Sequence, residues 1–365
     1  MKIVIDERAV QEIKESGCIS GLLLGREIQD ENLIQIVSFK ASLKLNFWHE
    51  VGRWYKEAVT NKGVELFVNS NELKCFIDGE EASQVEVFDM QDYNARNRSE
   101  IVSQKVKAKK AFLVSCGSVN SRIGYELAKH GIEVAITDPD YLDIANPYRW
   151  GIQQMPELLV GRAKTLAFKD SVLQCIPNAK VVAHTKDFCK EIAFFDKFTD
   201  EWKPDLMIIA TDTEDSRRDV NCLSYNKGIP ALYIGLADKA ESGQIIYISG
   251  KKEDPCYMCF KGDGGSDGGV INLRSTNKQY GIDEGEQRSV PALSADINII
   301  SDIATKLAMA ILAGEDTSQY FKQFDNKGDV MWFSTKPDTW VFEDFAQKLV
   351  AKIEKNPDCV VCGRM

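Results

Sequence analysis

The chain has 365 residues, of which 44% are hydrophobic and 27% charged, a composition typical of a folded globular protein. Acidic residues outnumber basic ones by 55 to 45, and the net charge of -10 argues against a protein whose main task is to bind nucleic acid. No apolar run approaches the roughly 18 to 20 residues that a membrane-spanning helix needs. We therefore expect a cytoplasmic protein with neither a nucleic-acid nor a membrane partner.

Residues 1–104 are expected to form a small α+β domain. Residues 19–39 predict two strands joined by a polar hairpin at 29–32, and residues 50–59 predict a strand or the start of a helix. The segments "GLLLG" and "VGRWYKE" are loosely similar to a JAB/MPN deubiquitinase domain, but its metal-binding His-x-His is absent. His49 alone lies nearby, and Tyr55, Lys56 and Glu57 stand in the place of the motif. A degenerate protease and an unrelated docking module both remain open, and either would bind the substrate or steady a dimer.

Residues 105–365 are expected to form a larger domain that opens with a nucleotide-binding pattern. Ala111–Val114 predicts a buried strand, residues 121–130 a helix, and residues 133–138 a second strand ending in Asp138. Between strand and helix, "SCGSVN" takes the place of a G-x-G-x-x-G motif and keeps only its middle glycine, Gly117. Asp138 lies 21 residues further on, about the spacing of a ribose-binding acid. Alone, this loop is equally compatible with a structural βαβ turn.

Three further segments follow: "DIANPYRWGI" (143–152), "VGRAKTLA" (160–167) and "PDLMIIATDTEDSRRDVN" (204–221). In this order they resemble the adenylyltransferase domain of the ThiF, MoeB and ubiquitin-activating (E1-like) family. That family has an aspartate-rich strand end, Asn-x-x-Arg, Gly-x-x-Lys, and a Thr-Asp turn followed by Arg and Asn. The matching residues here are Asp138 and Asp140, Asn146 and Arg149, Gly161 and Lys164, and Asp212 with Arg217 and Asn221.

The resemblance implies a Rossmann-like, mostly parallel sheet with helices on both faces and ligands at the carboxyl ends of its strands. It implies that a carboxylate attacks the α-phosphate of ATP and releases pyrophosphate, a reaction that depends on positioning and on cations. The implied nucleotide-binding residues are Gly117, Ser118, Asp138, Asp140, Asn146, Arg149, Lys164 and Asp212. Asp138 would take the ribose, Arg149 and Lys164 the phosphates, and Asp212 a Mg²⁺ ion; the last three are the expected catalytic residues.

Simpler interpretations exist for several of these residues. Asp212 could only cap the helix that follows it, and Arg149 and Lys164 could be solvated surface charges. Arg217 and Arg218 could equally well form structural ion pairs.

Four of the ten cysteines form two Cys-x-x-Cys pairs, Cys256 with Cys259 and Cys359 with Cys362. Four thiolates suit tetrahedral Zn²⁺, and a complete set of four leaves no open position for chemistry. We therefore predict a structural zinc site that holds the end of the chain to the domain, with a redox pair or disulfides as the alternative.

Members of the family that form a thioester carry a cysteine in the loop after the first Cys-x-x-Cys pair, and the corresponding residues 261–300 contain none. The chain is therefore most similar to the MoeB and MccB type, which adenylates without covalent capture. The implied substrate is the C-terminal carboxylate of a ubiquitin-like protein or a peptide. The family also implies a homodimer, in which Arg96 or Arg98 could be donated to the partner's site.

Two other functions stay open. Ser115 and Asn120, in place of glycines, favour a non-catalytic pseudo-E1 scaffold that has lost its nucleotide. The βαβ opening by itself would also suit an NAD-dependent oxidoreductase, although the Thr-Asp turn and the four cysteines serve no hydride transfer.

Overall fold

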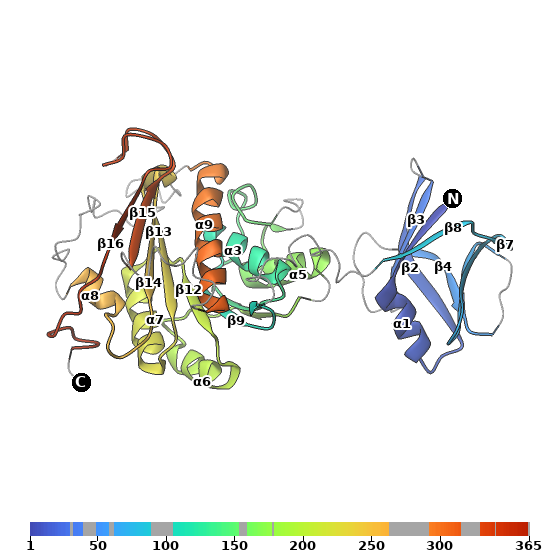
Figure 1. Ribbon diagram of the computed structural model, residues 1–365, viewed down its shortest axis with the longest axis horizontal. Helices are drawn as coiled ribbons and strands as arrows, with labels where there is room; N and C mark the ends of the chain where they lie inside the picture. The colour runs from blue at the N-terminus through green and yellow to red at the C-terminus, as the bar shows by residue number, and fades with distance from the viewer. Residues whose placement is uncertain are drawn as a thin grey trace. The chain divides into compact units, whose positions relative to one another are not determined.

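The computed structural model describes residues 1–29, 32–38, 49–57, 62–88, 105–152, 159–176, 179–262, 292–314, 329–339 and 341–363. The chain divides into two compact units, Met1–Ser99 and Glu100–Met365 (Figure 1). This division and the boundary expected after residue 104 both fall within 89–104, outside the described residues. Each unit has a hydrophobic core of its own and is described by itself.

The N-terminal unit is an eight-stranded sheet with a helix packed against it. Its strand order is β7-β6-β5-β4-β2-β3-β1-β8. The elements are β1 Lys2–Asp6, α1 Glu7–Glu15, β2 Ser20–Ile28, β3 Leu33–Ser38, β4 His49–Tyr55, β5 Val64–Val68, β6 Leu73–Ile77, β7 Glu80–Glu81 and β8 Gln84–Phe88. The predicted hairpin is confirmed, since β2 and β3 pair antiparallel. Val10 and Ile13 of α1 pack with Trp54 of β4 in the core.

Lys56 has a structural role in this unit. Its Nζ donates to the backbone carbonyl of Lys14 at 3.3 Å and also to that of Ser16. Both carbonyls lie at the C-terminal end of α1, where a cation is favourable. Kinship with JAB/MPN domains stays a prediction.

The C-terminal unit is built on a second eight-stranded sheet, with the order β11-β10-β9-β12-β13-β14-β15-β16. Its strands are β9 Lys110–Val114, β10 Glu133–Thr137, β11 Val181–His184, β12 Leu206–Ile209, β13 Ala231–Leu236, β14 Ser242–Ile248, β15 Val330–Ser334 and β16 Lys348–Ala351. The strands from β11 to β13 pair in parallel, and β14, β15 and β16 add antiparallel pairs. The predicted fold class is thus confirmed, with an antiparallel extension.

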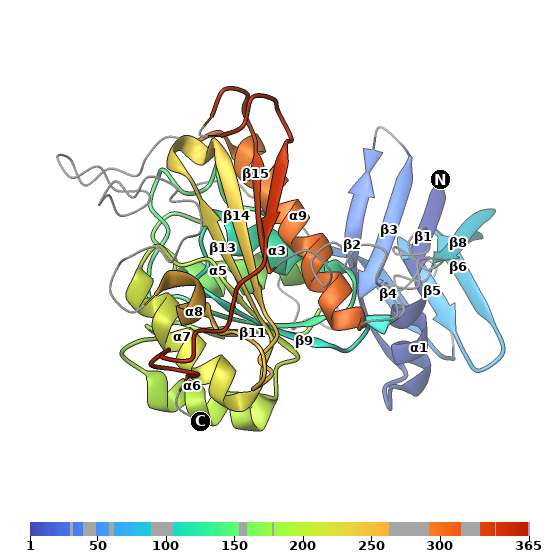
Figure 2. The ribbon, with the colours of Figure 1, turned by 60° about the vertical axis from the view of Figure 1, so that its left-hand side comes forward.

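Helices cover both faces of this sheet (Figure 2). One face carries α3 Ser118–Lys129, α5 Lys164–Cys175 and α9 Ser294–Ala313, and the other carries α6 Ile192–Trp202, α7 Glu214–Lys227 and α8 Tyr257–Lys261. The alternation of the strands divides the core in two, so that Leu113 joins the first face while Phe112 and Val114 join the second. Helix α3 begins at Ser118, earlier than the expected residue 121. Gly117 has an extended backbone and is its N-cap.

The order of strands reverses direction between β9 and β12, where the chain crosses from one half of the sheet to the other. Loops leave the carboxyl ends of these two strands in opposite directions, which creates the crevice where ligands bind in such sheets. Ser115, just after β9, spans the crevice by donating its Oγ–H to the carbonyl of Ala210, just after β12, at 2.9 Å. No helix in the described part of the chain is long and apolar enough to cross a bilayer.

Candidate functional site

The loop after β9 keeps the backbone geometry of a glycine-rich loop although it has lost glycines. Ser115 has φ +84°, in the left-handed region that normally favours glycine. Two hydrogen bonds hold it there: its N–H donates to the carbonyl of Thr137 at 2.9 Å, and its Oγ–H donates to Ala210. The first slot of the motif therefore keeps its conformation with a serine.

Gly117, the retained middle glycine, faces open space. Its φ of -78° suits any residue, and a Cβ built there would meet no atom of the described residues within 4 Å. Neither strain nor packing therefore requires a glycine at this position. As the N-cap of α3 it has no side chain, and no described side chain caps the helix, so the first N–H groups are available to an anion. This is the feature expected where a phosphate approaches the backbone closely.

Asn120, in the third glycine slot, acts as a clamp. It is fully buried, and its Nδ2 donates to the carbonyls of Val114 at 2.9 Å, Ser115 at 3.1 Å and Ile208 at 3.4 Å. The third glycine of the motif normally lets the helix pack closely against the strand. Here Gly124, one turn further along α3, allows this close packing. A Cβ on Gly124 would lie only 2.8 Å from a ring atom of Phe168.

Asp138 and Lys164 lie together at the carboxyl end of β10. The buried Asp138 carboxylate accepts the N–H of Cys116 at 2.7 Å and that of Asp140 at 2.9 Å. Lys164, the first residue of α5, places its Nζ 2.8 Å from Asp140 Oδ2 and 4.0 Å from Asp138 Oδ1. Burial lowers the pKa of Lys164, but the two carboxylates outweigh it and raise the pKa overall. Burial raises the pKa of Asp138, and Lys164 offsets this only in part.

Asp212 lies at the carboxyl end of β12. The helix α7 that follows is capped by Thr213, whose Oγ1 accepts the N–H of Ser216 at 3.4 Å, so Asp212 is not the cap. Asp212 reaches solvent, yet the protein around it raises the pKa of its carboxyl by desolvation. Arg217 and Lys164 lower that pKa in part. The charges of Lys164, Asp138 and Asp140, after β10, therefore act on the carboxyl of Asp212.

Asn146 and Arg149 lie in the turn between β10 and α5. The Asn146 Oδ1 accepts the N–H of Asp143 at 3.1 Å, and its backbone carbonyl accepts the N–H of Arg149 at 3.0 Å. Trp150 fastens this turn to the glycine loop, since its Nε1–H donates to the carbonyl of Cys116 at 3.2 Å. The amide oxygen of Asn146 thus shapes the turn, and the side chain of Arg149 is half-buried beside it. This role of Trp150 was not predicted, although Trp150 directly follows Arg149.

Arg217 has a structural role, but through backbone carbonyls and not through the ion pair that the sequence suggested as the alternative to ligand binding. Its guanidinium donates to the carbonyl of Thr211 at 3.1 and 3.2 Å and to that of Ile234 at 2.7 Å, which joins the ends of β12 and β13. Arg218 instead pairs with Asp215 at 3.8 Å on the exposed face of α7. Arg96, Arg98 and residues 263–291 of the loop without cysteine lie outside the described residues.

The four paired cysteines converge at the edge of the second core. Their Sγ atoms all lie within 4.8 Å of one another, with Cys256 3.6 Å from Cys359 and Cys259 3.2 Å from Cys362. In the part of the chain that the structure describes, no other group of three or more His, Cys, Asp or Glu side chains is close enough to share a metal ion. The predicted set of four therefore forms one candidate metal centre.

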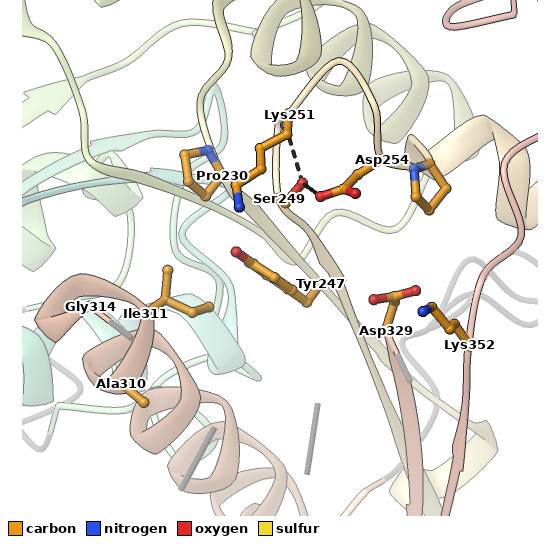
Figure 3. A pocket seen from close by; sticks show the side chains of 11 residues that line it. Pro230, Tyr247, Ser249, Lys251, Asp254, Ala310, Ile311, Gly314, Asp329 and Lys352 are labelled. Carbon is orange, nitrogen blue, oxygen red and sulfur yellow. Dashed lines mark hydrogen bonds between the residues drawn. The ribbon is translucent and has the colours of Figure 1, made fainter. Parts of the chain in front are cut away.

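A pocket of about 330 Å³ lies between α9 and the ends of β14 and β15 (Figure 3). It is at the opposite end of the sheet from Asp212, because Pro230 precedes β13 whereas Asp212 follows the parallel strand β12. Two of its polar side chains are paired, since Ser249 donates its Oγ–H to Asp254 at 2.6 Å; Ser249 Oγ also accepts the backbone N–H of Lys251 at 3.1 Å. None of the predicted site residues lines it. The crevice at the carboxyl ends of the strands is therefore the better candidate for chemistry.

Comparison with known proteins gives relatives that match about half of this chain. The chain is 22% identical over 207 residues to adenylyltransferase and sulfurtransferase UBA4 of Vanderwaltozyma polyspora. It is 26% identical over 193 residues to ubiquitin-like modifier-activating enzyme 5 of Caenorhabditis elegans. These matches cover 54% and 49% of this chain, and 45% of each relative, so the chain matches less than half of either relative's length.

Solved structures resemble the chain in fold. A structure of E. coli MccB with AMPCPP and MccA has a TM-score of 0.54 at 18% identity and covers 76% of this chain and 75% of that one. PaaA has a TM-score of 0.55 at 14% identity and covers 72% and 84%. The ThiF family model matches residues 91–339, which span the glycine loop, the acid and lysine cluster, Asp212 and the first cysteine pair. The chain therefore belongs to the ThiF family.

Proposed function

We propose that this protein is an ATP-dependent adenylyltransferase that activates the C-terminal carboxylate of a ubiquitin-like protein or a peptide. One observation carries the proposal: an open glycine-loop backbone at Gly117 lies next to Asp138, Lys164 and Asp212, at the carboxyl ends of neighbouring strands. A nucleoside triphosphate with its metal ion requires backbone N–H and cationic groups for the phosphates and acidic groups for the metal ion.

The reaction forms a bond between a substrate carboxylate oxygen and the α-phosphorus of ATP and breaks the bond to pyrophosphate, so no proton transfer is needed. Lys164, kept protonated by its carboxylate neighbours, and Arg149 would neutralise charge on the phosphates. Asp138 would accept the ribose hydroxyls, and Asn146 would orient the triphosphate through the turn that it closes. Asp212 would hold Mg²⁺ together with phosphate oxygens and water, because Mg²⁺ commonly uses only one or two carboxylates.

We further propose that the four cysteines bind Zn²⁺. With Zn–S bonds of about 2.3 Å, tetrahedral geometry separates the sulfur atoms by about 3.8 Å, close to the 3.6 Å between Cys256 and Cys359. Four thiolates suit zinc, and the complete set leaves no position for a reacting water. The ion would hold residues 353–363 against α8, which gives it a structural function.

The substrate class is supported by the relatives. The C. elegans relative is named as an activator of ubiquitin-like modifiers, and the E. coli structure contains MccB together with MccA. Because residues 261–300 contain no cysteine, we propose that the acyl-adenylate passes to its acceptor without a thioester on that loop. Residues 1–104 would dock the substrate or steady the dimer.

A homodimer is part of this proposal. Tyr141, Ile144 and Tyr148 are apolar side chains that are 68%, 72% and 79% exposed in the turn beside the nucleotide site. A second copy would cover them and could donate Arg96 or Arg98. Sedimentation of the full chain would check this, because a monomer at micromolar concentration contradicts it.

Calorimetric titration with Mg·ATP tests the nucleotide site. We expect Asp212→Ala and Lys164→Ala each to weaken binding at least tenfold, because each removes a charge that faces the metal-bound triphosphate. Arg218→Ala is the matched control, since Arg218 is exposed and pairs only with Asp215 at 3.8 Å among the described contacts; its affinity should equal that of the wild type.

Pyrophosphate exchange with peptides ending in a free carboxylate then tests the reaction. A wild type that binds no ATP at millimolar concentration, with and without candidate partners, would contradict adenylation and favour a scaffold. The strained Ser115 and the missing glycines are what favour that alternative. Tighter binding of NAD than of ATP would favour the oxidoreductase.

A further inference from the structure

Asn221 links the helix after Asp212 to the candidate metal centre. It lies two turns into α7 and is fully buried. Its Oδ1 accepts the N–H of Tyr257 at 2.9 Å. Tyr257 is the first residue of α8 and directly follows Cys256, so this hydrogen bond fixes the backbone beside one of the four thiols.

The other end of the Asn221 amide has no hydrogen-bond acceptor among the described residues. Its Nδ2 is buried and makes no hydrogen bond within the part of the chain that the structure describes. The Cys256 thiol is a candidate acceptor, because Cys256 directly precedes Tyr257, whose N–H the same amide group accepts. Buried amide groups are rarely left unpaired, so this donor calls for an acceptor in the functional state. A neutral thiol is a weak acceptor, whereas a metal-bound thiolate carries negative charge and accepts well.

We propose that Asn221 is a positioning residue of the metal centre, whose Nδ2 donates an N–H···S hydrogen bond to the metal-bound Cys256 thiolate. Its Oδ1 at the same time holds the first residue of α8. Such outer partners orient the ligands of metal centres and reduce the charge on the coordinating atom. This inference rests on the proposed metal site and is independent of adenylation.

The position of Asn221 on α7 also connects the candidate metal centre to the strand ends beside Asp212. Arg217 lies four residues earlier, on the same face of the helix, and binds the carbonyls at the ends of β12 and β13. One face of α7 therefore holds the strand ends beside Asp212 with Arg217 and the metal centre with Asn221. The helix connects the two sites through these two side chains.

Asn221→Asp tests the donor, since it keeps the size of the side chain and the acceptor for Tyr257 but removes the N–H group. We expect the apparent Zn²⁺ affinity, measured by competition with a chromophoric chelator, to fall between about 10-fold and 100-fold. In the Co²⁺-loaded protein, the thiolate-to-metal charge-transfer band should move to longer wavelength, because a thiolate without the hydrogen bond gives up its electrons more easily. Asn226→Asp, exposed on the same helix, is the control for the charge and should leave both readings unchanged.

An unchanged Zn²⁺ affinity and an unchanged band in Asn221→Asp would overturn the proposal. If the variant is insoluble, the wild type loaded with ¹¹³Cd provides the test, because an N–H···S bond carries a scalar coupling between the metal and the side-chain proton of Asn221. Absence of that coupling in a protein with bound metal would also overturn it. A wild type that binds no metal would overturn the metal centre itself, whatever its behaviour toward ATP.

Discussion

At the scale of single residues, Gly117 separates a structural role from a binding role. Because its φ is negative and its Cβ would meet open space, Gly117→Ala should leave the free energy of unfolding within about 1 kcal/mol of the wild type. The added methyl would occupy the space where a phosphate of the proposed nucleotide would approach, so we expect at least a tenfold loss of Mg·ATP affinity. Thermal unfolding and calorimetry on the same preparation would measure both effects.

Gly124→Ala is the matched comparison. There the added methyl would lie 2.8 Å from Phe168 and 3.0 Å from Leu113, so it should destabilise the fold by about 1–3 kcal/mol. The ATP affinity of the molecules that fold should be unchanged. Equal ATP affinities for wild type and Gly117→Ala would mean that no phosphate comes near this loop.

Whether the role of a residue could be predicted depends on how far along the chain its contact partners lie. The spacing of the glycine loop and of Asp138 follows from one βαβ unit, so the sequence was enough to predict that they belong together. Asn120 could not be understood in that way, because one of its acceptors is Ile208, 88 residues away. The brace formed by Arg217 depends in the same way on Ile234, in a neighbouring strand.

At the scale of elements, β11 and α6 form an aromatic cluster around His184. The rings of Phe194, Phe195 and Phe198 contact the imidazole edge-on at centroid distances of 5.2, 5.9 and 4.7 Å. The Nε2 atom is buried and has no hydrogen-bond partner among the described residues. Burial lowers the pKa of His184, and the nearby Lys186 lowers it further.

The sign of the resulting pH dependence follows from this lowered pKa. The unfolded chain binds the proton more tightly, so the stability contribution of His184 is complete above about pH 6.5 and is lost as the pH falls through the lower folded pKa. We expect His184→Phe to reduce the loss of stability between pH 7.5 and 5.5, measured by urea unfolding. The same pH dependence in both proteins would show that His184 does not contribute.

The antiparallel end of the sheet is the element that the expectation of a mostly parallel sheet did not include. Only Ala237 to Glu241 separate β13 from β14. Parallel neighbours need a crossover of a dozen residues or more, so this short connection makes the pair antiparallel. The ends of β13 and β14 could not be read from the sequence, so the shortness of the connection between them could not be predicted either.

At the scale of the whole molecule, a metal ion bound by the four cysteines would close a loop of 103 residues between Cys256 and Cys359. Removing the metal with a chelator, or replacing Cys359 by Ser, should free residues 353–363 from α8. We expect the melting temperature of the C-terminal unit to fall by roughly 5–10 °C and the released segment to become sensitive to protease. The N-terminal unit has a separate core and should be unaffected.

Cys175→Ser is the control for this experiment, since Cys175 is an exposed thiol outside the centre. It should behave like the wild type in both calorimetry and limited proteolysis. Equal stability of chelated and untreated protein would show that the four cysteines contribute no metal-dependent stability.

Two of the four cysteines lie on a segment that has no regular structure after β16 ends at Ala351. Ile353 is held by Asp329 at 3.0 Å, and Asn356 donates its N–H to Cys259 Sγ at 3.5 Å. Segments without regular secondary structure generally open more often than the sheet beside them unfolds. A metal ion bound there could therefore exchange while the sheet stays folded. Its residence time would then report how often this one segment opens.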